Sequence, residues 1–157
     1  MFATSDNIII TTACVGGVLG KGDEQVQQYY LDFLERNKHR CFLEVGHHMD
    51  EKQVTYNEKL LLLSKSTGVP LIAGTATHVL NAEHEKGRSI LQASKNITFD
   101  GEERWDLKFK TYDELVAAYR EQGSLPEAEY MQAIENTNVM ADMVEPFELD
   151  RGTLAKQ

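Results

Sequence analysis

The sequence predicts an α/β fold in which parallel strands alternate with helices, followed by a helical segment. Three short apolar runs are each followed by a stretch with apolar residues at helical spacing. This alternation is typical of βαβ units, which form an open sheet or a barrel. It stops after Phe99, and two further helical stretches come later. We therefore expect β/α units in residues 1–110 and a helical segment in residues 111–157.

The first β/α unit begins with the β-branched run Ile8–Thr12, which predicts a buried strand. A loop of small residues through Gly20 follows it. Residues 22–40 predict a helix of about three to four turns with Asp23 as N-cap. Its apolar stripe is expected to pack in the core rather than to stack nucleobases, and consists of Val26, Tyr29, Tyr30, Phe33 and Leu34.

The next units repeat this pattern. Cys41–Val45 predicts a second strand and Gln53–Thr67 a second helix, which Gly68 and Pro70 end. Val69–Ala73 predicts a third strand. The third helix is expected over Asn81–Ser94, with Asn81 as its cap.

Residues 100–110 predict a loop that runs into an extended piece. Two helices follow, over Thr111–Glu121 and Pro126–Met143. Thr111 and Glu114 form a capping box, and Pro126 suits the first turn of its helix. Residues 145–157 have no apolar periodicity of a helix or strand, and we expect them to be a connecting segment that is cut off from its continuation.

Composition limits the function classes. The 157 residues fit one domain, and 16 basic against 25 acidic residues give a net charge of −9. This sign excludes a module that holds nucleic acid by phosphate neutralisation alone. Two cysteines, no signal peptide and no long apolar segment predict a cytoplasmic protein with no membrane insertion.

Chemistry-bearing side chains follow each predicted strand. Cys14 follows the first, Glu44, His47 and His48 end the second, and His78 follows the third. The carboxyl ends of parallel strands meet at one edge, and thiolate, imidazole and carboxylate are ligands of zinc and related metals. Other interpretations stay open: a buried apolar Cys14, a capping or packing His78, and a solvated His47–His48 loop. No nucleophile elbow and no phosphate-binding loop occurs.

Several segments carry a family resemblance in their order along the chain. They are IIITTACVGGVLGKGD, FLEVGHH, NEKLLLLSKSTGVPLIAGTATHVLNAEHEKGRSILQ, FKTYDELVAAY and AIENTNVMAD. Together they resemble the later part of the PHP (polymerase and histidinol phosphatase) domain of bacterial replicative DNA polymerase III alpha subunits. The resemblance covers nearly the whole chain.

The resemblance implies part of a distorted (β/α) barrel whose strand ends hold zinc or manganese ions. In related proteins such a cluster hydrolyses phosphoesters, in some polymerases as a 3′ to 5′ exonuclease, and elsewhere the domain serves as a dock. By position, Cys14 and His78 match metal ligands of the family. Ala76 stands where the family's Asp-x-His motif has its aspartate, so that ligand is lost. Glu44, His47 and His48 are expected to be neighbours of the site.

The resemblance also implies that the first half of the domain and the polymerase core are absent, so that Met1 begins inside a domain. A fragment cut from a longer polymerase chain or a truncated gene would both give this result. The expected partners are the remainder of the alpha chain, DNA through that chain, and a proofreading exonuclease subunit. A partial barrel has unpaired sheet edges, so we also expect self-association.

Three functions remain open from the sequence. The first is a piece of the polymerase alpha subunit that is inactive alone, and the second is a metal-dependent phosphoesterase or exonuclease. The third is a docking module without chemistry. The helical segment from Thr111 onward favours the first over the second, because a free-standing phosphatase has no need of it.

Overall fold

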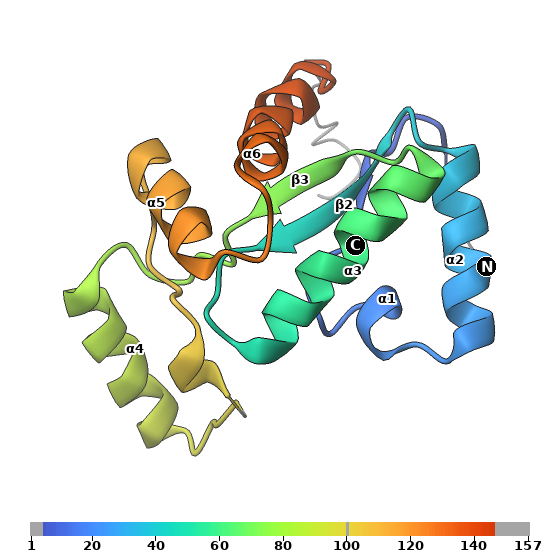
Figure 1. The fold of residues 1–157 in the computed structure, drawn as a ribbon. Coiled ribbons are helices and arrows are strands. Elements are labelled where there is room, and N and C mark those ends of the chain that lie inside the picture. The colour runs from blue at the N-terminus through green and yellow to red at the C-terminus, as the bar shows by residue number, and fades with distance from the viewer. Residues whose placement is uncertain (1–4, 100, 147–157) are drawn as a thin grey trace, which may run out of the picture.

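Three short parallel strands form the centre of the structure (Figure 1), a computed structural model that describes residues 5–99 and 101–146. The strands β1 (Ile10–Thr11), β2 (Cys41–Gly46) and β3 (Leu71–Gly74) lie in the order β1-β2-β3. Within the described residues the sheet is open. The expected α/β fold with parallel strands and later helices is confirmed.

The first crossover consists of two helices, α1 (Val18–Lys21) and α2 (Glu24–Arg36). Asp23 caps α2 as predicted, because its side chain accepts a hydrogen bond from the Val26 amide. The prediction of a plain loop through Gly20 was wrong, since α1 forms one helical turn there. Leu19 is fully buried and holds this turn against the core.

The apolar stripe of α2 is only partly buried. Tyr30 and Leu34 lie in the core, whereas Val26 and Tyr29 are exposed. The expectation that the whole stripe packs was therefore wrong. No other described element covers the outer side of α2, so only its sheet-facing side is buried.

The helices that follow β2 and β3 agree closely with the predictions. Helix α3 (Glu51–Thr67) begins earlier than predicted because the Asp50 side chain caps it. Helix α4 (Ala82–Ser94) is capped by Asn81, whose side chain accepts from two backbone amides. A short 3₁₀ turn, η1 (Glu102–Arg104), follows. Beyond it, backbone hydrogen bonds join residues 107–109 to residues 78–79, which confirms the extended piece.

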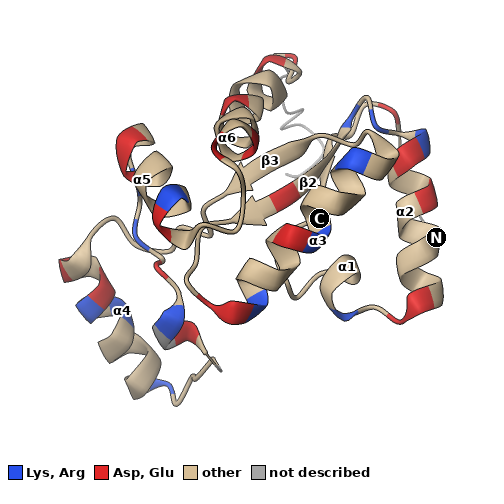
Figure 2. Ribbon diagram, viewed as in Figure 1, with Lys and Arg blue, Asp and Glu red and all other residues tan. Residues whose placement is uncertain are grey.

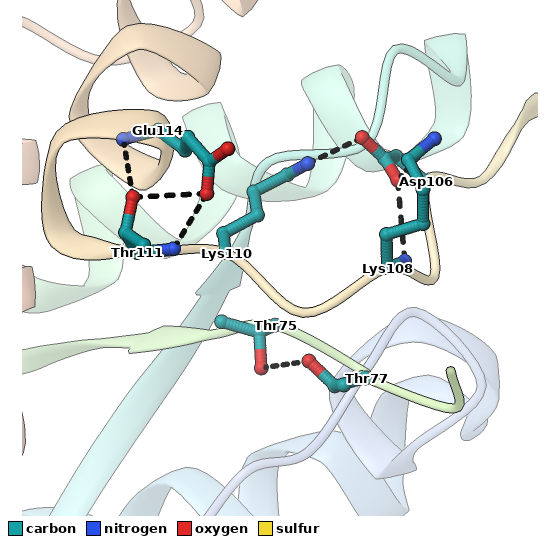
Figure 3. Close-up of polar contacts among 7 residues, drawn as sticks. All are labelled: Thr75, Thr77, Asp106, Lys108, Lys110, Thr111 and Glu114. Carbon is teal, nitrogen blue, oxygen red and sulfur yellow. Dashed lines mark hydrogen bonds and ion pairs between the residues drawn. The ribbon is translucent and has the colours of Figure 1, made fainter. Parts of the chain in front are cut away.

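The last two helices are α5 (Tyr112–Gln122) and α6 (Glu127–Asp142). Thr111 and Glu114 form the predicted capping box (Figure 3). Pro126 is the N-cap of α6 and lies just before its first turn. The predicted severed connection falls mainly on residues 147–157, which lie outside the described residues. No described helix is long and apolar enough to cross a membrane.

Helix α6 covers one edge of the sheet. It packs on β3, and the side-chain amide of the buried Asn136 donates to the Leu71 carbonyl at 2.7 Å. A helix in this position shields unpaired backbone groups of the edge strand from pairing with another strand. β1 is the other outer strand of the sheet, and the expected self-association through unpaired sheet edges stays a prediction.

Replacing Asn136 with alanine should lower the free energy of unfolding by about 1–2 kcal/mol, because a buried carbonyl loses its donor. Urea denaturation measures this change. The control is Asn138→Ala, an exposed position on the same helix, where the change should stay within about 0.5 kcal/mol. Equal effects of the two substitutions would show that Asn136 does not cap the strand edge.

Candidate functional site

The ends of the three strands open into one small cavity of about 150 Å³. Its lining brings together five of the six residues that the sequence singled out, which are Cys14, Glu44, His48, Ala76 and His78. His47 lies directly behind His48, with ring centroids 4.7 Å apart. The expected meeting of these strand ends is therefore found in the structure.

Cys14 reaches the cavity from a sharp turn after β1. Ala13 adopts a left-handed conformation with φ +56°, which few residues other than glycine favour. The thiol of Cys14 is exposed, whereas Cys41 is buried. The alternative of a buried, purely apolar Cys14 is thus wrong.

Glu44 is held in place by hydrogen bonds and by a glycine. Its carboxylate accepts from the Thr11 hydroxyl at 2.7 Å, and its backbone amide donates to the Thr12 hydroxyl at 2.9 Å. The side chain lies across Gly74, where any Cβ would overlap it. The carboxylate is therefore already engaged within the sheet.

His47 and His48 are buried, with exposed fractions of 2% and 6%. The alternative of a solvated loop is thus wrong. The ring of His48 stacks on Trp105 at 5.8 Å, and the His47 ring meets the Tyr119 ring edge-on. The Gln122 side chain, at the end of α5, donates to the His48 carbonyl at 2.5 Å and so fixes the backbone of the loop that follows β2.

Burial keeps both histidines neutral. It lowers the pKa of His47 from 6.5 to about 4, with further lowering by His48 and Lys110. Burial also lowers the pKa of His48, although Asp106 opposes that shift. Among the described residues, neither ring nitrogen of His47 has a hydrogen-bond partner, and Nδ1 of His48 has none. The backbone of Gly74 raises the pKa of His47 slightly, which offsets only a small part of the lowering by burial.

The third strand end carries Ala76 and His78, and both are exposed. Ala76 is left-handed, with φ +46°. Nδ1 of His78 lies 2.6 Å from the Ala76 carbonyl, so the ring is held by the backbone two residues earlier. His78 is therefore not a core-packing residue. Beside it, the hydroxyl of Thr77 donates to that of Thr75 at 3.0 Å (Figure 3).

Trp105 and its neighbours were not predicted as site residues. The segment reaches the cavity because the His78 and Val79 amides donate to the Leu107 carbonyl. Asp106 receives hydrogen bonds from Lys110 and from Lys108 (Figure 3). Burial alone would raise the pKa of Asp106, but these hydrogen bonds outweigh it and lower the pKa to about 2. The one feature of the sequence that could have pointed to this segment as part of the site is its single tryptophan among mostly polar residues.

The side chains as arranged do not fit a metal ion. Among the described residues no group of three or more His, Cys, Asp or Glu side chains is placed to hold one. The Glu44 carboxylate is bonded to Thr11, His78 Nδ1 faces the Ala76 carbonyl, and Ala76 offers no donor. The roles of Cys14 and His78 as metal ligands stay a prediction, as does the binding of zinc or manganese.

Comparisons with known proteins show a distant similarity to bacterial DNA polymerase III subunits. No family model matches the chain. It is 27% identical over 154 residues to the DNA polymerase III subunit alpha of Borreliella burgdorferi. The matched region covers 92% of this chain and 13% of that protein. It is 28% identical over 152 residues to the PolC-type DNA polymerase III of Clostridium perfringens, covering 89% of this chain and 10% of that protein.

A third relative is the PolC-type DNA polymerase III of Staphylococcus haemolyticus, which is 26% identical over 152 residues. The matched region covers 89% of this chain and 10% of that protein. The chain is a distant homologue of a segment of these polymerase subunits. It spans only about a tenth of their length. The resemblance to replicative polymerase III alpha subunits is confirmed at this level.

Acid should destabilise the protein through His47. The unfolded chain binds a proton near pH 6.5, whereas the folded state binds it only near pH 4. Stability therefore falls as the pH drops through this window, by about 2 kcal/mol between pH 7 and pH 5 from His47 alone. Denaturation at both pH values measures the loss.

His39→Gln, at an exposed histidine, is the matched control and should keep this pH dependence. His47→Gln should reduce it. An NMR titration of the wild-type imidazole signals tests the cause even if that variant fails to fold. A His47 ring that titrates near its ordinary pKa of 6.5 would contradict the account.

Proposed function

We propose that this chain is the later part of a PHP domain of a replicative DNA polymerase III alpha subunit, with a weakened metal site and no catalysis of its own. The observation that carries the proposal is the common cavity of Cys14, Ala76 and His78 at the carboxyl edge of the sheet. This is where the family resemblance puts its metal ligands. Distant homology to a segment of polymerase III alpha subunits supports it.

The proposed loss of activity follows from the ligand set. A hydrolytic metal centre needs anionic ligands to hold the ion and to tune the acidity of its bound water. Ala76 supplies a methyl group instead, and the nearby Glu44 carboxylate is bonded to Thr11. In this proposal the chain works as part of a cytoplasmic replicative polymerase, whose remaining chain and DNA are its partners.

The backbone at position 76 is suited to the residue that the family has there. Ala76 lies in the left-handed region, where aspartate and asparagine are accommodated better than alanine. The side chain is exposed at the cavity. Ala76→Asp and Ala76→Asn therefore both fit the fold, and only the former adds a charged ligand.

Ala76→Asp should bind zinc more tightly than the wild type, by about tenfold or more, because a carboxylate joins Cys14 and His78. Isothermal titration with zinc measures the affinity. Ala76→Asn is the matched control, since it has the same shape without the charge, and should bind as weakly as the wild type. Equal affinities of the two variants would show that the lost carboxylate is not what weakens the site.

Metal content and nuclease activity test the proposal against the phosphoesterase alternative. The purified wild-type protein should carry far less than one zinc or manganese ion per chain and release no nucleotide from single-stranded DNA. Elemental analysis and a gel-based exonuclease assay measure both quantities. Stoichiometric metal together with nucleotide release would overturn the inactive-fragment proposal.

One observation favours the third function, a docking module for a proofreading exonuclease or for the remaining polymerase chain. Helix α4 has no buried residue, and Ile90 and Leu91 are 71% and 54% exposed. Phe99, just beyond the helix, is exposed as well. An apolar helix face of this kind is typical of a protein contact. Docking is compatible with the inactive-fragment proposal, because neither needs chemistry at the cavity.

A further inference from the structure

Helix α4 lies away from the sheet and has little support from the rest of the described chain (Figure 1). None of its 13 residues is buried, and it packs closely on no other described helix or strand. Gly87, near its middle, lowers helix stability by about 1 kcal/mol relative to alanine. An isolated helix of this length is marginal in water. A contact from outside the chain would therefore stabilise α4.

The side of α4 that faces its own chain is polar. Arg88 and Gln92 both donate to the Glu102 carboxylate of η1, at 2.5 and 2.8 Å. The partly buried residues of the helix are Glu85, Arg88 and Gln92, and their spacing puts them on one side. An ordinary surface helix turns its apolar side inward and its polar side to the solvent. Helix α4 has the reverse arrangement.

The opposite side of α4 carries Glu83, Gly87 and Ile90, and Leu91 lies at its margin. Ile90 is 71% exposed and Leu91 is 54% exposed. A Cβ atom added to Gly87 would meet nothing within 4 Å, so the space in front of this glycine is open. These residues form an exposed apolar face with room for a side chain from another molecule, which is typical of a protein contact.

The charges at the two ends of this face are complementary to each other. Glu83 lies in the first turn and Lys95 directly follows the last, and both are exposed. Among the described residues neither forms an ion pair. Figure 2 shows acidic positions toward the start of α4 and a basic position at its end. A helix with the same charges fits this face only in the antiparallel direction.

A second copy of α4 meets this condition. In an antiparallel pair, Glu83 of each copy lies opposite Lys95 of the other, and Leu91 lies opposite the open space at Gly87. Both pairs of positions are centred on Ser89, so one two-fold axis satisfies them together. The antiparallel direction also brings the positive end of each helix dipole beside the negative end of the other.

We infer that two copies of this chain associate through α4, with the two helices antiparallel about a two-fold axis. The inferred contact gives a partner to the face that the docking alternative uses, and it needs neither a metal ion nor the cavity at the strand ends. A single helix face buries less than the roughly 1,200 Å² of a stable interface, so the dimer should be weak and concentration-dependent.

Sedimentation velocity of the whole chain over a range from about 10 to 500 µM tests this contact. EDTA is present, and a reducing agent prevents a disulfide between two copies of the exposed Cys14. Ile90→Gln should weaken the dimer about tenfold or more, because a two-fold axis removes the apolar side chain twice. Leu62→Gln is the matched control, since Leu62 is 69% exposed on α3, and should change the affinity by less than about twofold.

Charge reversal tests the antiparallel direction. Glu83→Lys and Lys95→Glu should each weaken the dimer about threefold or more, because each places like charges opposite one another. An equimolar mixture of these two variants should associate about as well as the wild type, since each variant supplies the charge that the other lacks. A mixture that associates no better than either variant alone would overturn the antiparallel contact.

Two further results would overturn the inference. A dimer that Ile90→Gln and Leu62→Gln affect equally would place the contact elsewhere, for example at a sheet edge. A wild-type protein that stays monomeric at every concentration would leave the face to a different protein. Neither result bears on the inactive-fragment proposal, which metal content and nuclease activity test separately.

Discussion

The carboxyl edge of the sheet depends on one buried side chain, that of Asn57. It satisfies both backbone groups of Gly46, accepting from the amide at 3.1 Å and donating to the carbonyl at 2.7 Å. In effect it replaces a neighbouring strand at the point where β2 ends. The same side chain contacts Gln122 and Ser124, at the end of α5 and just beyond it. A buried network of this kind is stable only when its members are all satisfied.

This network joins the site to the later helices. Because Gln122 also donates to the carbonyls of Gly46 and His48, the loop of the buried histidines is fixed from the α5 side. Tyr119 of α5 adds a hydrogen bond to the Val45 carbonyl. The helical segment from Thr111 onward therefore shapes the cavity. Its contribution comes through backbone positions and not through chemistry at the cavity.

Local signals in the sequence located most elements. Asn81 and the Thr111 box begin their helices through contacts within a few residues, so a sequence pattern is enough to find them. The burial of His47 and the approach of Trp105 depend on ring contacts between residues 72 and 57 positions apart in the chain, and no local pattern carries that information. The site residues at the strand ends were found because parallel strands bring their carboxyl ends to one edge.

The most direct test of this geometry uses the single tryptophan and the one exposed cysteine. A bimane label on Cys14, with Cys41 buried and unreactive in the folded state, would lie at the cavity that Trp105 lines. Tryptophan quenches bimane only at close contact. We expect strong quenching that is relieved in Trp105→Phe and on unfolding. Equal bimane fluorescence in the wild type and in Trp105→Phe would contradict the shared cavity.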